Sequence, residues 1–90
     1  MIEMVKVIEV RSLGSYRLHL AFSDGSEGER DFSDIVAESG PMVEPLADEE
    51  LFSQVFIELG TLAWPNGFDL DAIALHMEMK AAGQLRRRAA

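Results

Sequence analysis

The sequence contains no cysteine, which excludes disulfide bonds and thiolate metal sites. It also lacks a long hydrophobic run: the longest uncharged stretch, residues 59–68, is interrupted by Gly, Pro and Asn and is too short to span a membrane. The opening Met1-Ile2-Glu3 has no basic segment of the kind that begins a signal peptide. With 90 residues, we expect one cytoplasmic domain without membrane contact, held together by core packing alone.

Basic residues are scarce as well. Eight Lys and Arg residues stand against 16 Asp and Glu, for a net charge of −8. So acidic a chain repels a phosphate backbone, which argues against nucleic acid as a partner of the whole domain. Three of the basic residues are consecutive, Arg86, Arg87 and Arg88, so residues 1–85 alone carry a net charge of −11.

This change from an acidic to a basic segment at residue 86 predicts a single compact domain over residues 1–85 and a short basic tail over residues 86–90. The tail can be a solvated helix end, because cations suit a helix C-terminus. It can also be an arm that docks on an acidic surface, including the chain's own body. Arg86, Arg87 and Arg88 are in addition the candidate contact for a polyanion.

The clearest strand pattern covers residues 16–22, where apolar and polar residues alternate strictly. We expect its apolar face to point to the core and Arg17 and His19 to point outward. A β-branched run predicts a preceding strand over residues 4–10. Asp24-Gly25 predicts a hairpin into a third strand over residues 26–32.

The charged third strand allows two hairpin registers. A two-residue loop would place Glu27 and Glu29 on the apolar face, beside Leu20 and Phe22. A three-residue loop with a bulge would turn both carboxylates toward the polar face. We favour the bulged register, because burying an unpaired carboxylate is costly. In either register the charges predict an edge strand.

Beyond the hairpin, the sequence predicts two short helices, a second strand pair and a last helix. Ser33 is the expected cap of a helix over residues 34–39, and Asp48 the cap of the second. Strands are expected over residues 56–59 and 62–64, joined at Gly60. The fold class is therefore α+β: an antiparallel sheet built from an N-terminal three-stranded unit and a later strand pair, with two short helices between them and a C-terminal helix packed on the sheet.

The last strand runs into a structural signature, which comprises Trp64, Pro65, Asn66, Gly67 and Asp69. Proline ends the strand because it has no N–H to donate, and Asn-Gly tolerates the positive φ of a tight turn. Asp69 or Asp71 can then cap the final helix. Trp64 is expected to anchor the core, and the alternative is a ring that stacks on a ligand.

Two apolar stripes lie on opposite sides of the predicted final helix. One stripe holds Leu70, Ile73, Ala74, Met77 and Ala81, and we expect it to face the core. The other holds Ala72, Leu75 and Met79. Either the helix is sandwiched within the fold, or these three residues form the candidate interface for a protein partner or a second copy of the chain.

No catalytic residue, cofactor or metal site is expected. His76 lies near Asp69 and Asp71 in the sequence, but the five-residue step from Asp71 to His76 separates them by about 140° around a helix. The serines lack a local histidine motif, so a nucleophile–base pair has no support. We expect a protein that is not an enzyme.

The chain resembles the bacterial family catalogued as domain of unknown function 2442, over about residues 5–78. The resemblance is carried by Tyr16-Arg17-Leu18, Phe22-Ser23-Asp24-Gly25, Asp31-Phe32, Pro45-Leu46 and Trp64-Pro65-Asn66-Gly67-Phe68-Asp69. The chain departs from the family at Glu27 and Glu29, where apolar residues are frequent, and at Ala72, where proline is frequent.

The resemblance implies a small α+β protein, often encoded beside a small partner protein in an arrangement like a toxin–antitoxin pair. It supplies no catalytic residues. The leading hypothesis is a non-catalytic binding module, antitoxin-like or regulatory. The alternative is a nucleic-acid-binding or transcription-accessory protein that acts through its basic C-terminal residues, although residues 1–90 leave no room for the helix-turn-helix of some relatives.

Overall fold

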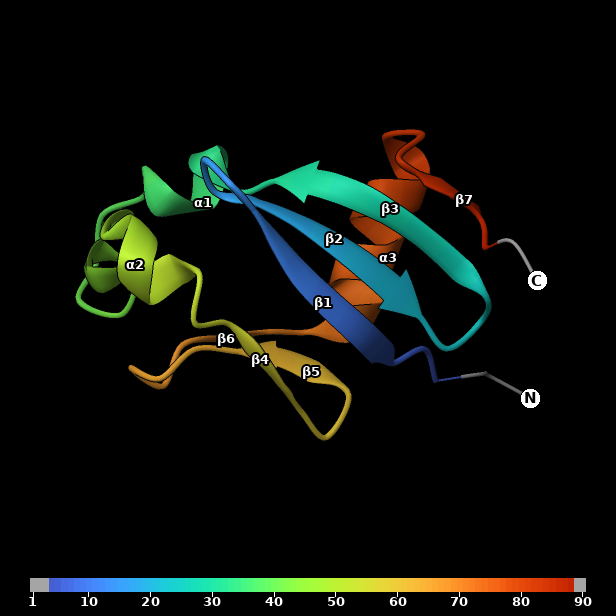
Figure 1. Cartoon of the computed structure of the whole chain (residues 1–90), viewed down its shortest axis with the longest axis horizontal. Coiled ribbons are helices and arrows are strands. Elements are labelled where there is room, and N and C mark those ends of the chain that lie inside the picture. Colours follow the sequence, from blue (N-terminus) through green and yellow to red (C-terminus); the bar gives the residue numbers. More distant parts are fainter. Residues whose placement is uncertain (1–3, 89–90) are drawn as a thin grey trace.

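The N-terminal third of the chain forms an antiparallel meander, as its alternating pattern predicts. A computed structural model describes residues 4–88 and places three consecutive strands there (Figure 1): β1 (Val7–Gly14), β2 (Arg17–Phe22) and β3 (Ser26–Asp31). The β1–β2 turn is formed by Ser15 and Tyr16, which both have positive φ, as does Gly14 at the end of β1, and this explains the break in the pattern.

The β2–β3 hairpin adopts the bulged register. Leu18 lies opposite Arg30 and His19 opposite Glu29, so Glu29 is on the polar face. There its carboxylate accepts a 2.7 Å hydrogen bond from Arg17. The register predicted from the cost of burying carboxylates is confirmed. This register places Arg30 on the core side, where its guanidinium lies 4.5 Å from the Phe32 ring centroid.

The outward face of β2 is more deeply buried than its sequence predicts. His19 is only 5% exposed, although we expected it to face solvent. The side chains of the flanking strands cover it: Glu9 of β1 and Glu27 of β3 both lie within 4 Å of its Nε2. A central strand with long side chains on either side is buried on both faces even where one face is polar.

The predicted basic tail is part of the sheet, and β3 is not an edge strand. Strand β7 (Leu85–Arg87) pairs with Ser26–Gly28 and completes the order β1-β2-β3-β7. Gly28 makes this possible, since a Cβ there would lie 2.0 Å from the carbonyl oxygen of Gln84. The domain boundary at residue 85 was therefore wrong. Residues 89–90 lie outside the described residues.

Three short helical segments follow β3: α1 (Ser33–Val36), η1 (Glu44–Ala47) and α2 (Glu49–Phe52). Asp48 caps α2 as predicted, accepting a 3.0 Å hydrogen bond from the Glu50 N–H. The short helix α1 is present, but it ends earlier than residue 39 and the prediction of its cap was wrong. Phe32 precedes its first residue, and the Ser33 hydroxyl instead donates to Asp31, so Ser33 supports the turn before the helix.

The later strand pair builds a second sheet. Strands β4 (Phe56–Glu58) and β5 (Thr61–Ala63) form a hairpin, and β6 (Asp69–Leu70) pairs with β5. A hydrogen bond of 2.9 Å from the Val7 N–H to the Gly60 carbonyl ties this sheet to the start of β1. The chain thus carries two small sheets where we expected a single one.

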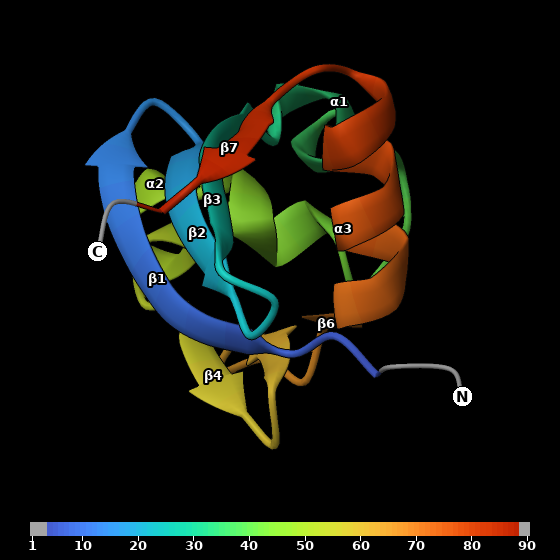
Figure 2. The ribbon, with the colours of Figure 1, turned by 90° about the vertical axis from the view of Figure 1, so that its right-hand side faces the viewer.

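Helix α3 (Ala72–Ala81) covers one face of the four-stranded sheet (Figure 2), and Asp71 caps it as predicted. The sequence pattern predicted the wrong stripe to face the core. Met79 is fully buried, with Ala72 and Leu75 also in the core, whereas Met77 is 65% exposed. Leu70 misled the assignment, because it belongs to strand β6 and its direction says nothing about the helix.

Candidate functional site

The signature turn holds β5 and β6 together. The Gly67 N–H donates to the Trp64 carbonyl at 2.9 Å, and the Trp64 N–H donates to the Phe68 carbonyl at 2.9 Å. Gly67 has a φ of 95°, which favours glycine. The Asn66 side chain donates to the Met42 carbonyl at 2.9 Å and so fastens the loop before η1 to the turn.

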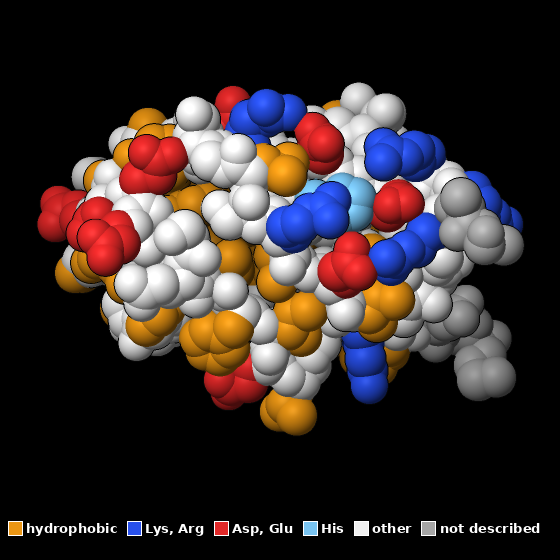
Figure 3. All heavy atoms as spheres, in the orientation of Figure 1, with side chains coloured by type: hydrophobic (Ala, Val, Ile, Leu, Met, Phe, Trp, Pro, Cys, Tyr) orange, Lys and Arg blue, Asp and Glu red, His pale blue; other side chains and the backbone are white. Residues whose placement is uncertain are grey.

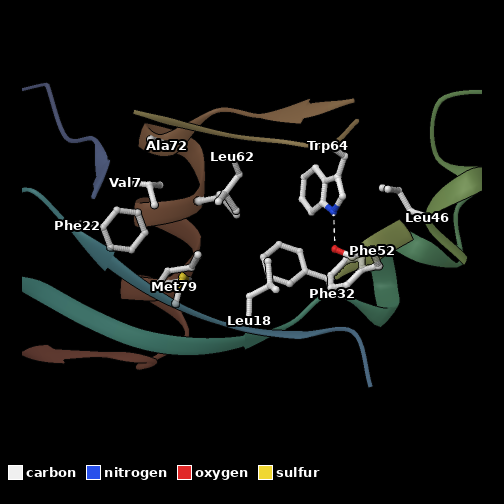
Figure 4. Close-up of a cluster of buried hydrophobic side chains, with 12 residues drawn as sticks. Val7, Leu18, Phe22, Phe32, Leu46, Phe52, Leu62, Trp64, Ala72 and Met79 are labelled. Atoms are coloured by element: carbon white, nitrogen blue, oxygen red, sulfur yellow. Dashed lines mark hydrogen bonds between the residues drawn. The ribbon is translucent and has the colours of Figure 1, made fainter. Parts of the chain in front are cut away.

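Trp64 is the centre of the core, as predicted. It is 2% exposed, and its ring centroid lies 5.6 Å from those of both Phe52 and Phe68. Its indole Nε1 donates to the Phe52 carbonyl at 2.9 Å (Figure 4). A buried indole N–H needs such an acceptor. Trp64 therefore has a structural role in the core.

The outer face of the second sheet carries a hollow of about 340 Å³ beside this turn. Cross-strand pairing explains which side chains face it, because Phe56 lies opposite Ala63, and Ala63 opposite Asp69. The hollow is lined by apolar and acidic residues together: Phe56, Glu58, Leu59, Thr61, Ala63, Trp64, Gly67 and Asp69.

Leu59 is the exceptional residue of this surface. It occupies the β4–β5 turn with a φ of 52°, followed by Gly60 with a φ of 79°. Two-residue turns with positive φ at both positions favour Asn-Gly, and a leucine there is strained. Its side chain is also 94% exposed. Figure 3 shows hydrophobic side chains along the lower edge of the molecule, over this hairpin.

The hairpin surface, defined as Phe56, Leu59 and the hollow they line, was missed by sequence reasoning. We expected the interface on Ala72, Leu75 and Met79 instead, and that prediction was wrong because these side chains fill the core of the monomer. The signal that could have found the hairpin surface is the Leu59-Gly60 pair, in which an apolar residue occupies a position where turn chemistry favours asparagine.

The C-terminal arginines dock largely on the acidic body of the chain, one of the two interpretations of their sequence. Arg88 bonds Glu9 at 2.8 Å, which lowers the pKa of that carboxyl and raises the pKa of Arg88. Arg86 lies 3.9 Å from Glu27. The same two carboxylates flank His19, and Figure 3 shows acidic, basic and histidine side chains gathered over β1–β3.

His76 does not meet Asp69 or Asp71. Its Nε2 lies 2.8 Å from Asp24 Oδ2, and its ring packs edge-on against Phe22. Burial raises the pKa of Asp24, but hydrogen bonds from Ser26 and His76 outweigh it and hold the pKa below its usual value. Among residues 4–88, no three His, Asp or Glu side chains are arranged to hold a metal ion.

Residues 7–81 match the family described as protein of unknown function (DUF2442). The chain belongs to this family. The matched region runs from the start of β1 to the end of α3 and includes the whole signature turn and the hairpin surface. No curated protein and no solved structure matches the chain. Within the described part of the chain, no helix is long and apolar enough to cross a bilayer.

Proposed function

We propose that this chain is a non-catalytic binding module that takes a protein partner on its hairpin surface. The observation that carries the proposal is Leu59, which combines a left-handed backbone with a side chain that is 94% exposed. The left-handed backbone lowers the stability of the free protein, and the exposed side chain adds nothing to its packing. Strained residues and exposed apolar groups gather where a surface is used for recognition.

The partner's chemistry follows from the residues around the hollow. Phe56 and Leu59 offer apolar contact, while Glu58 and Asp69 add negative charge to the same lining. The chain as a whole carries −8. The fitting partner is a basic protein that inserts an apolar side chain flanked by Lys or Arg, since complementary charge guides association and fixes register.

The family resemblance directs the choice of partner. The resemblance implies a small partner protein encoded beside the chain, and an antitoxin-like or regulatory role would follow from binding that protein. We therefore test the product of the neighbouring gene first. A second copy of this chain is the other molecule that could bind to the hairpin surface.

The test is co-expression of the tagged chain with its neighbour, followed by affinity purification. The double variant Phe56→Glu/Leu59→Glu places two charges on the hairpin surface. The matched control Ile73→Glu/Met77→Glu places two charges on the exposed stripe of α3. We expect the neighbour to co-purify with the wild type and the control but not with the hairpin variant. Failure to co-purify with the wild type, retention by the hairpin variant, or self-association in its place contradicts the proposal.

The alternative, a nucleic-acid-binding protein acting through Arg86, Arg87 and Arg88, has weaker support. Arg86 and Arg88 lie against Glu27 and Glu9, so part of their charge is already compensated. A gel-shift titration distinguishes the two functions, because nucleic-acid binding weakens steeply with salt.

A further inference from the structure

A second hollow lies on another side of the molecule, where the β2–β3 turn, α3 and β7 meet. Its volume is about 310 Å³, at the lower end of the range for small-molecule sites. It is lined by Asp24, Ser26, His76, Lys80, Leu85, Arg86 and Arg87. Three of these seven residues are cations and one is an acid, the reverse of the balance over the whole chain.

Two of the cations are not compensated by the fold. Arg17, Arg30, Arg86 and Arg88 each lie within 4 Å of a carboxylate. Among the described residues, neither Lys80 nor Arg87 has a carboxylate partner at that distance. Arg87 reaches only the Asp24 carbonyl oxygen, at 3.5 Å. Lys6 and Arg11 are likewise without such a partner among the described residues, but Lys80 and Arg87 line the same hollow and so concentrate positive charge there.

The acid in the hollow is already occupied. Asp24 Oδ1 accepts hydrogen bonds from the Ser26 N–H and hydroxyl, at 3.0 and 2.6 Å. Its Oδ2 accepts from His76 Nε2 at 2.8 Å. These donors hold Asp24 in place and occupy its oxygens, but its single negative charge remains in the hollow, where the three lining cations outnumber it. The local surplus of positive charge therefore attracts an anionic ligand into the hollow.

We infer that this hollow binds a phosphate group, either free or carried by a small monoester. Lys80, Arg86 and Arg87 would surround the phosphate oxygens, as guanidinium and ammonium groups do in phosphate sites. Leu85 gives the organic part of the ligand an apolar wall. The inference does not depend on the hairpin surface, which lies on the other sheet.

The experiment is a set of titrations followed by backbone amide shifts. The probes are inorganic phosphate, adenosine monophosphate and a single-stranded oligonucleotide, each added to the wild type, Lys80→Ala/Arg87→Ala and Arg11→Ala. Arg11 is an exposed cation on β1 away from the hollow, so its variant controls for loss of net charge. We expect shifts around Asp24 and Leu85 with phosphate or the monophosphate, affinity at least 10-fold weaker in the double variant, and affinity within about twofold of the wild type in Arg11→Ala.

Tighter binding of the monophosphate than of inorganic phosphate identifies an organic ligand, and equal binding identifies phosphate itself. Both outcomes support the inference. Binding of the oligonucleotide alone overturns it in favour of a nucleic-acid surface. It is also overturned if neither phosphate compound binds, or if Arg11→Ala weakens binding as much as the double variant. Circular dichroism of each variant verifies that the fold is retained.

Discussion

The indole Nε1 of Trp64 donates a 2.9 Å hydrogen bond to the main-chain carbonyl of Phe52, across twelve residues of sequence. This bond links the end of α2 to the end of β5, and both residues are buried in the same core. It explains why the signature begins with tryptophan, because the indole fills a large buried volume and also donates a hydrogen bond from its ring N–H.

Trp64→Phe should lower the free energy of unfolding by about 2–4 kcal/mol, because the Phe52 carbonyl loses its donor and a smaller ring leaves a cavity. Urea unfolding followed by circular dichroism measures the loss. Phe56→Leu, at an exposed position, should stay within about 0.5 kcal/mol of the wild type. Equal losses in the two variants would show that Trp64 has no special role.

Met79 and Met77 give a matched test of the orientation of α3. They lie two residues apart on one helix, and their exposed fractions are 0% and 65%. Met79→Ala should cost about 2–5 kcal/mol, as expected for truncation of a core side chain. Met77→Ala should cost less than about 0.5 kcal/mol. Thermal and urea unfolding compare the two variants. A larger loss of stability in Met77→Ala than in Met79→Ala would show that α3 has the orientation favoured by the sequence pattern.

Gly28→Ala should detach β7 from the sheet. The added Cβ would lie 2.0 Å from the Gln84 carbonyl oxygen, so the backbone before β7 has to move. We expect the amides of residues 85–87 to lose protection in hydrogen exchange. A chain truncated after Gln84 should show similar stability, since it lacks the same strand. Unchanged protection in Gly28→Ala would mean that β7 pairs in another register.

The Asp24 carboxyl should make stability depend on pH in the acid range. Its pKa in the folded state is lower than the usual value of 3.8, so the unfolded chain takes up its proton first as the pH falls. The stability that Asp24 provides is therefore complete above about pH 5 and is lost as the pH falls through the folded-state pKa. Asp24→Asn should be less stable than the wild type at pH 7, and the difference should shrink as the pH falls below about 5.

Urea unfolding of the wild type and Asp24→Asn across this pH range measures the difference in their free energies of unfolding. The other carboxyls contribute equally to both proteins where they are independent of residue 24, so their contributions cancel. A constant difference between the two proteins at all pH values would show that Asp24 acts through packing and not through its charge.

Local chemistry determined the parts of the fold that were predictable. Desolvation of Glu27 and Glu29 selected the correct hairpin register, and Asp71 capped α3 as its position required. The signature turn also followed, because Pro65 and Gly67 each permit few backbone conformations. In each case a residue and its neighbours in sequence contained the physical reason.

Long-range contacts determined the rest. Strand β7 has no alternating pattern and exists because Gly28 leaves room for the backbone at Gln84, which is 56 residues later. The pair of His76 and Asp24 likewise joins residues 52 positions apart. Periodicity failed on α3 for a related reason: it counted Leu70 as helical, although pairing with β5 makes it part of a strand.

Leu59→Asn tests the central claim most directly, because it separates stability from binding on the hairpin surface. Asparagine suits the positive φ of this turn, so the variant should gain about 0.5–1 kcal/mol in the free energy of unfolding. If Leu59 contacts the partner, calorimetric titration with the product of the neighbouring gene should show at least a 10-fold loss of affinity in the same variant. A variant that is more stable and binds the neighbour as tightly as the wild type would contradict the claim.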